Sequence, residues 1–153
     1  MIHTEPITIE KIIQNIEDKN DIGITKNILI VGCGICANIS SSTNRGGTKP
    51  GMSLLFKPLA IDAEIEELSS KLREKYDSVD SITIKGLCTI NARSEHKIKS
   101  KVKNADTIIV MSCPSGMKAV ETYFEDKKLI MGMRVKGFQA SRIKLTTKGI
   151  FFK

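Results

Sequence analysis

Two short runs of apolar, mostly β-branched residues constrain the fold of this chain more than any other feature. They are Asn27–Val31 (NILIV) and Thr107–Met111 (TIIVM). A continuous apolar run of this length is typical of a strand that is buried on both faces, as in a parallel sheet. A third segment, Val79–Leu87 (VDSITIKGL), alternates apolar and polar residues and predicts another strand.

The segments between these strands have the periodicity of amphipathic helices. The clearest helix is expected over 61–76, and shorter ones are expected over 8–18, 92–102 and 115–124. Ser115 is the expected N-cap of the last helix. This alternation of strands and helices predicts an α/β fold, a three-layer sandwich with a mainly parallel, Rossmann- or flavodoxin-like sheet.

The length of 153 residues fits a single domain that spans 1–153. We expect a flexible start and a helix within 1–25, and a loop rich in Ser, Thr and Gly over 40–51. The segment 131–153 alternates lysines with apolar residues and predicts short antiparallel strands or a packing arm. Its apolar end, Ile150–Phe152, is expected either to dock on a neighbouring subunit or to fold back onto the chain's own sheet.

The formal net charge of +7 results from 24 basic and 17 acidic residues. The lysines are spread along the chain, and the two Tyr and five Phe residues do not alternate with basic residues as a stacking platform would. We therefore expect a solvated basic surface suited to an acidic partner, and no nucleic-acid binding. His3 and His96 have no evident partner and are expected to be exposed to solvent.

No apolar run approaches the roughly 20 residues that a transmembrane helix needs. The segment Met1–Lys11 contains acidic residues and lacks the apolar centre of a secretory signal. We therefore expect no membrane association and a cytoplasmic location. In such a reducing compartment, four cysteines are more typical of metal ligands, catalytic groups or core residues than of disulfides.

Each cysteine stands at the end of a predicted strand. Cys33 and Cys36 follow the first strand, Cys88 follows the second, and Cys113 follows the third. Because the carboxyl ends of parallel strands meet at one edge of a sheet, the four thiols are expected to gather there. Four thiolates suit a 4Fe-4S cluster or a tetrahedral zinc ion. The sequence therefore predicts one metal centre with four cysteine ligands.

Glycines accompany these cysteines. Gly32 and Gly34 would let the backbone come close to a bulky inorganic core, and Gly116 shapes the turn after the third strand. The glycine pair also fits a loose dinucleotide fingerprint. However, 38–60 contains no Asp or Glu to hold a ribose, so nucleotide binding is not the favoured interpretation.

Two other interpretations of the cysteines stay open. Cys33 and Cys36 form a Cys-x-x-Cys pair, which is also the pattern of a dithiol redox pair. Such a pair would not require Cys88 or Cys113. Free cysteines are also common as small buried residues with no ligand at all.

The order of several motifs resembles that of a known family. The motifs are Val31-Gly-Cys-Gly-Ile-Cys36, Gly46-Gly-Thr-Lys49, Cys88 after a strand, Ala105-Asp-Thr-Ile-Ile-Val-Met-Ser-Cys113, and Met117-Lys-Ala-Val-Glu121. Together they resemble the small subunit associated with bacterial methylenetetrahydrofolate reductases, also known as the reductase C-terminal domain family. The resemblance implies an iron–sulfur or zinc protein that serves a folate-dependent catalytic subunit in one-carbon metabolism.

The chain departs from this family at two points. Ser40 stands where the family usually has a third cysteine, and no cysteine follows Cys113. The family's further clusters therefore do not carry over. We expect an auxiliary subunit without catalytic residues of its own, which relays electrons to a methylenetetrahydrofolate reductase-like partner or stabilises it. The alternatives are a thiol oxidoreductase and a metal-free structural subunit, and self-association is left open.

Overall fold

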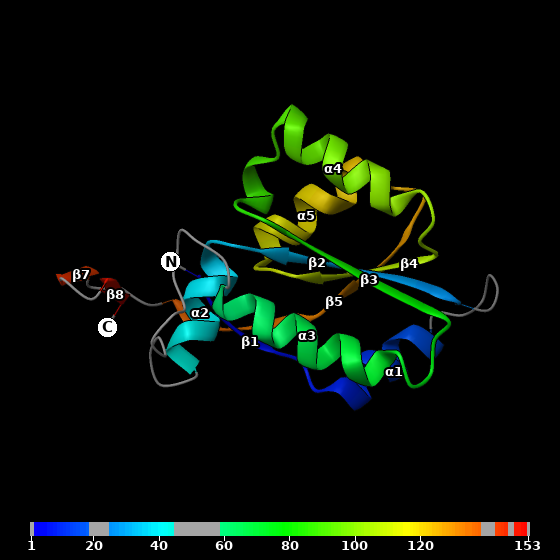
Figure 1. Ribbon diagram of the computed structural model, residues 1–153, viewed down its shortest axis with the longest axis horizontal. Helices are drawn as coiled ribbons and strands as arrows, with labels where there is room; N and C mark the ends of the chain where they lie inside the picture. The colour runs from blue at the N-terminus through cyan, green and yellow to red at the C-terminus, as the bar shows by residue number, and fades with distance from the viewer. Residues whose placement is uncertain (1, 19–24, 45–58, 139–142, 147–148, 153) are drawn as a thin grey trace.

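A computed structural model describes residues 2–18, 25–44, 59–138, 143–146 and 149–152. Its centre is a four-stranded parallel sheet with helices on both faces, as Figure 1 shows. The strand order is β3-β2-β4-β5, which confirms the expected α/β sandwich with a Rossmann- or flavodoxin-like sheet. The four strands are β2 (Asn27–Cys33), β3 (Ser78–Ile84), β4 (Thr107–Met111) and β5 (Lys128–Met131).

The two central strands, β2 and β4, contain the apolar runs. Every residue of β4 and all but the first residue of β2 are buried. In the parallel register, Ile30 pairs with Ser81 on one side and with Ile109 on the other. The three expected strands thus share one sheet. The fourth strand, β5, was not expected, because its four residues (KLIM) are too few to show a periodic pattern.

Helices cover both faces of this sheet. In Figure 1, α1 (Ile9–Asp18) and α3 (Ala60–Leu72) lie on one face, and α4 (Ala92–Val102) and α5 (Pro114–Tyr123) lie on the other. All four helices were expected, although α3 ends four residues before the expected Tyr76. Their buried apolar residues are Ile12 and Ile16 in α1, Ile61, Ile65, Leu68 and Leu72 in α3, Ile98 and Val102 in α4, and Val120 in α5.

The start of α5 differs from the prediction. Cys113, not Ser115, is the N-cap, so the Ser115 prediction is wrong. Pro114 takes the first helical position, where its missing N–H costs no hydrogen bond. A cysteine therefore stands at the end of the helix where the helix dipole is positive.

The N-terminal segment is a strand rather than a flexible start, so this expectation was wrong. β1 (Ile2–Pro6) pairs antiparallel with β6 (Met133–Phe138) in a separate two-stranded sheet. His3 is only 7% exposed, which also contradicts its expected exposure. β1 pairs with β6 and packs against α2 (Cys36–Asn44), and both partners lie far along the sequence, so no local signal shows this burial. The other histidine, His96, is exposed on α4 as expected.

The predicted loop 40–51 begins as a helix, which corrects that boundary. α2 (Cys36–Asn44) continues through the serines. Serine and asparagine favour turns because their side chains compete for backbone hydrogen bonds. In α2 these side chains bond to other elements: Ser40 Oγ accepts from Thr4 N at 3.0 Å, and Asn38 Oδ1 accepts from Ile61 N at 3.1 Å. The rest of the expected loop, 45–51, lies outside the described residues.

The C-terminal segment contains short antiparallel strands, as one of the two interpretations expected. β7 (Ile143–Thr146) pairs with β8 (Gly149–Phe152) in a separate two-stranded sheet. The end of the chain thus pairs with its own neighbour in sequence and not with the main sheet. The side chains of this hairpin lie outside the described part, so docking of Ile150–Phe152 on a partner stays a prediction.

Candidate metal centre

The four cysteines follow the carboxyl ends of three neighbouring strands. Cys33 is the last residue of β2, and Cys36 is the first residue of α2. Cys88 lies in the short 3-10 helix η1 (Leu87–Thr89) after β3, and Cys113 comes just after β4. Because these strands are parallel neighbours, all four cysteines belong to the same edge of the sheet.

The turn that carries Cys33 and Cys36 is attached to the end of β3. The backbone N–H of Gly34 donates a hydrogen bond to the carbonyl oxygen of Ile84 at 2.7 Å. A side chain built on Gly86 would have its Cβ 3.4 Å from Cδ1 of Ile35. The turn between β2 and α2 therefore lies directly against the segment that leads to Cys88.

The other two cysteines are brought together by the packing of η1 on α5. A Cβ on Gly116, in the first turn of α5, would lie 3.1 Å from Cβ of Leu87 and 2.9 Å from Cβ of Ser112. The absence of a side chain at Gly116 thus allows Leu87 to approach the helix closely. This contact sets Cys88 beside the end of α5 at which Cys113 stands.

The glycines that the sequence singled out are close-packing positions. A Cβ on Gly32 would lie 2.4 Å from Cδ1 of Ile65 in α3, and one on Gly34 would lie 3.3 Å from Cα of Lys85. Protein atoms therefore fill the space beside Gly32, Gly34 and Gly116. The glycines let the cysteine-bearing elements come close to one another, and their contact with a cofactor stays a prediction.

The strand order places this edge at a topological switch point. From β2 the chain moves outward to β3 and then returns across β2 to β4. The helices that follow β2 and β4 leave on opposite faces, as α2 and α5 show in Figure 1. In open α/β sheets, the crevice between such diverging connections is where ligands bind. Cys33 ends β2, Cys36 begins the helix after it, and Cys113 follows β4, so all three border this crevice.

The thiols lie close enough to influence one another electrostatically. Burial, together with the nearby thiols of Cys113, Cys33 and Cys88, raises the pKa of Cys36 from 9.0 to about 11. The positive ends of α2 and α5 act in the opposite direction, because helix dipoles stabilise thiolates. At Cys36, burial and like charge outweigh that effect. Without a cation, the Cys36 thiol is therefore protonated at neutral pH.

The four thiols differ in their access to solvent. Cys33 and Cys113 are 2% and 4% exposed, Cys36 is half-buried, and Cys88 is exposed. Ile35, between the first two cysteines, is 47% exposed although it is apolar. The candidate centre is therefore closed on the side of the sheet and open to solvent at Ile35 and Cys88.

The chemistry of the four candidate ligands fits a metal centre that is bound by thiolates. All four candidate ligands are cysteines, which suits zinc or an iron–sulfur cluster better than magnesium or calcium. Among the residues that the structure describes, no three His, Cys, Asp or Glu side chains are already arranged to hold one metal ion.

A second group of polar residues was not singled out from the sequence. Glu5 of β1 stands opposite Arg134 of β6, and Lys136 is two residues further along the same strand. The local signal for this group is the alternation of Arg134 and Lys136 in β6. The pairing itself joins segments that are more than 120 residues apart, so sequence patterns do not show it.

Comparison of the chain with protein families, curated proteins and solved structures gives no match. The resemblance to the reductase small subunit therefore rests on the motifs alone. In the described part of the chain, no helix has both the length and the apolar character needed to cross a bilayer.

Proposed function

We propose that this protein holds a metal centre through Cys33, Cys36, Cys88 and Cys113, and that it serves a redox enzyme as an auxiliary electron carrier. The observation that carries this proposal is the gathering of four cysteines, which follow three neighbouring strands, at the edge of the sheet that contains the switch point. The parallel strands explain why these four positions meet at one edge, but they give no reason for a cysteine at each of them. A common ligand supplies such a reason.

A 4Fe-4S cluster is the favoured group, and zinc is the alternative. Zinc needs four sulfurs about 2.3 Å from one point. A cluster places irons and sulfides between its ligands, so its cysteines stand farther apart. The electrostatic coupling of Cys36 with the other thiols suits either arrangement, so the metal analysis described below decides between the two groups.

The chain would provide the ligands of the metal centre, bury one side of it and leave the other side accessible to a redox partner. The buried Cys33 and Cys113 would anchor the group on the protein side, and backbone amides at the starts of α2 and α5 would favour its negative charge. A bound cluster supplies one-electron transfer. The exposed Cys88 and Ile35 leave one side open for a redox partner to approach.

The proposed partner is the catalytic subunit of a methylenetetrahydrofolate reductase-like enzyme in the cytoplasm. This part of the proposal rests on the order of the motifs from Val31 to Glu121. A reducing compartment keeps the four thiols available as ligands. The chain's net charge of +7 would favour an acidic surface on the partner.

A thiol oxidoreductase is less well supported. The attacking cysteine of such enzymes is an accessible thiolate with a lowered pKa. In this chain Cys33 is 2% exposed, and the pKa of Cys36 is raised to about 11. Neither residue of the pair has the properties of a nucleophile at neutral pH.

The test is anaerobic purification followed by analysis of iron, sulfide and zinc. We expect iron and sulfide in nearly equal amounts, with broad visible absorption and a paramagnetic signal after reduction. Each of the four Cys→Ser variants should lose most of the iron. Ser115→Ala is the matched control, because Ser115 is exposed in the same helical turn that follows Cys113.

The outcomes separate the alternatives. Stoichiometric zinc with no iron would make the centre structural and would contradict electron transfer. Iron that survives replacement of Cys88 or Cys113 would contradict the four-ligand centre. Activity of a folate-dependent reductase that does not change when this protein is added would contradict the proposed partner.

A further inference from the structure

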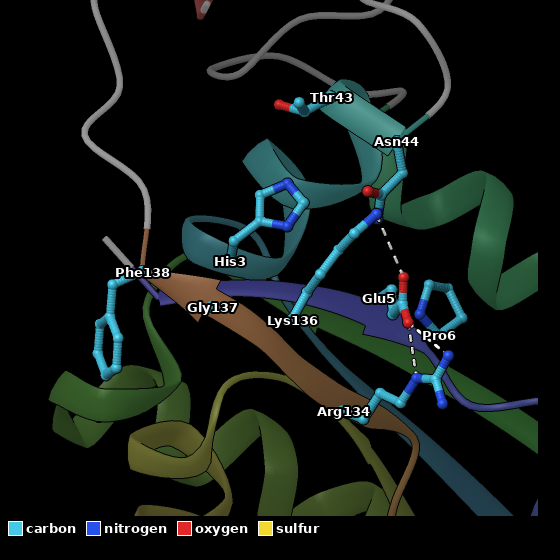
Figure 2. Close-up of a pocket in the computed structure, with 9 residues that line it drawn as sticks. All are labelled: His3, Glu5, Pro6, Thr43, Asn44, Arg134, Lys136, Gly137 and Phe138. Carbon is cyan, nitrogen blue, oxygen red and sulfur yellow. Dashed lines mark hydrogen bonds and ion pairs between the residues drawn. The ribbon is translucent and has the colours of Figure 1, made fainter.

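A second candidate site lies between the β1–β6 ribbon and the end of α2. It is an open cavity of about 820 Å³, and Figure 2 shows the residues around it. Polar and charged side chains dominate its lining, and none of the four cysteines belongs to it. The lining residues used below are His3, Glu5, Arg134 and Lys136.

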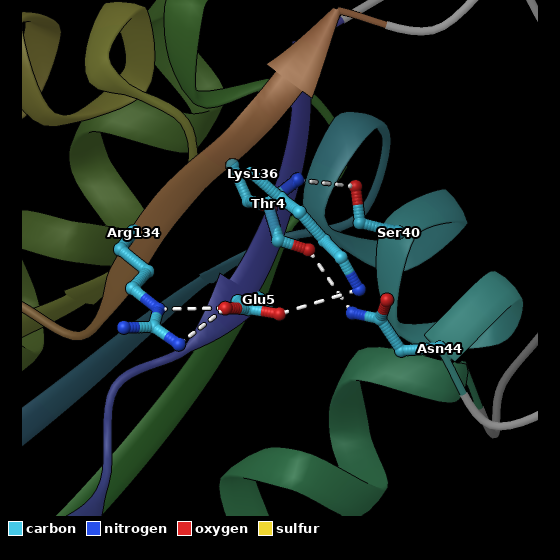
Figure 3. Close-up of polar contacts among 6 residues, drawn as sticks. All are labelled: Thr4, Glu5, Ser40, Asn44, Arg134 and Lys136. Atoms are coloured by element: carbon cyan, nitrogen blue, oxygen red, sulfur yellow. Dashed lines mark hydrogen bonds and ion pairs between the residues drawn. The ribbon is translucent and has the colours of Figure 1, made fainter.

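Two cations in this cavity share a single carboxylate. Arg134 contacts Glu5 Oε1 through Nε at 2.6 Å and Nη2 at 2.5 Å, and Nζ of Lys136 lies 3.4 Å from Glu5 Oε2. Figure 3 shows both cations directed at the carboxylate from β6. One positive charge therefore remains uncompensated in this group. Both cations also keep N–H groups that no described contact uses.

His3 adds a buried polar atom without a partner. The residue is 7% exposed, and its Nε2 makes no hydrogen bond to the part of the chain that the structure describes. Buried polar side-chain atoms are normally hydrogen-bonded, and one without a partner calls for an explanation. Because the His3 side chain lines the same cavity as the two cations, a rotation of its ring toward the cavity would let a bound anion become the partner of Nε2.

We propose that this cavity binds the phosphate group of a small metabolite. His3, Arg134 and Lys136 offer hydrogen-bond donors from three separate side chains, and a tetrahedral oxyanion can accept from several directions. A planar carboxylate has fewer oxygens to offer. The cavity is larger than free phosphate requires and lies within the usual range for small-molecule sites, roughly 300–1,000 Å³. This inference is independent of the metal centre.

The test uses nuclear magnetic resonance of the two histidine rings. The protein is titrated at fixed ionic strength with glycerol 3-phosphate, with inorganic phosphate and with glycerate. We expect glycerol 3-phosphate to shift the His3 signals to saturation and to leave the His96 signals unchanged, because His96 is exposed on α4. Inorganic phosphate should bind more weakly, and glycerate more weakly still.

Two variants change the charge of the cavity in opposite directions. Lys136→Met should weaken binding by at least about tenfold, because it removes a charged hydrogen-bond donor. Glu5→Gln should strengthen binding, because it releases both cations. Lys118→Met is the control, since Lys118 pairs with Glu121 on α5.

The proposal fails if His3 does not respond to glycerol 3-phosphate, or if Lys136→Met binds it as tightly as the original protein. Equal affinity for glycerate would overturn the choice of phosphate. Equal affinity for inorganic phosphate would overturn the choice of a metabolite. Unchanged dispersion of the remaining amide signals shows that each variant is folded.

Discussion

The backbone N–H of Gly34 donates a hydrogen bond to the carbonyl oxygen of Ile84 at 2.7 Å. This bond joins the turn after β2 to the last residue of β3. Cys33 and Cys36 flank Gly34, and Cys88 follows Ile84 by four residues. One backbone contact therefore holds two segments of the candidate metal centre in a fixed relationship.

Replacement of Gly34 by valine should disturb this relationship. A Cβ at this position would lie 3.3 Å from Cα of Lys85 and 3.4 Å from the carbonyl oxygen of Ile84, and backbone atoms cannot rotate away. We expect a loss of about 1–3 kcal/mol in the free energy of unfolding, measured with urea, together with a lower metal content. Gly86→Ala is the control, since its close neighbours are side-chain atoms of Thr89 and Ile35. Equal stability of the Gly34 variant would show that the turn can move freely.

Asn38 should be important for stability although it lies in a helix of small polar residues. The residue is 1% exposed, and its Oδ1 accepts from the backbone N–H of Ile61 in the first turn of α3. Asn38→Ala leaves this buried N–H without a partner. We expect a loss of about 1–3 kcal/mol in the free energy of unfolding. Asn44→Ala, at the partly buried end of α2, should cost less in the same assay.

Asp106 should make stability depend on pH in the acid range. Backbone N–H groups of Asn27 and Lys26 donate to its carboxylate at 2.9 and 3.1 Å and lower the pKa of Asp106. A carboxyl group whose pKa is lowered by folding stabilises the protein at pH values above its pKa in the unfolded state. This stabilisation is lost as the pH falls toward its pKa in the folded state. Asp106→Ala should therefore cost about 1 kcal/mol at neutral pH, a value reduced by solvent exposure.

The pH comparison provides the control for this prediction. The difference between the Asp106→Ala variant and the original protein should shrink as the pH falls, because the protonated carboxyl loses its preference for the folded state. Asp77→Ala is the matched variant, because it removes another exposed aspartate from the same protein. A difference that stays constant down to acid pH would mean that the carboxylate charge is not responsible.

Cys36 should make the metal-free protein sensitive to alkali. Burial and the neighbouring thiols raise the pKa of Cys36 from 9.0 to about 11. A thiol whose pKa is raised by folding contributes its full stabilisation at pH values below its pKa in the unfolded state. This contribution is lost as the pH rises toward its pKa in the folded state. Unfolding of the reduced, metal-free protein at increasing pH should show this loss, and Cys36→Ser should lack it.

Alkylation gives a second measure of the same property. At neutral pH the exposed Cys88 should react with iodoacetamide faster than Cys36, because Cys36 is half-buried and its raised pKa reduces the fraction of reactive thiolate. Peptide mass mapping at several reaction times would give both rates. Equal rates would contradict the raised pKa.

The sequence alone predicted the elements whose signals are local. The runs at Asn27–Val31 and Thr107–Met111 identified the two central strands, because a strand buried on both faces must be apolar throughout. The helix expected over 92–102 has the observed bounds, since a 3.6-residue period extends over three turns. The shared edge of the four cysteines followed from the same strands, because parallel strands end on the same side.

Tertiary structure decided the features that depend on distant partners. β1 pairs with β6, which sets Glu5 opposite Arg134, and β1 also packs against α2, so His3 is buried only in the folded chain. α2 is helical although its serines favour turns, because Thr4 and Ile61 supply partners for its side chains. The same holds for the thiols. Their common edge of the sheet could be predicted from the strands, but the burial of Cys33 and the exposure of Cys88 are decided only when the elements pack. Local periodicity reflects contacts within a few residues, whereas burial and electrostatic coupling depend on every element that packs nearby.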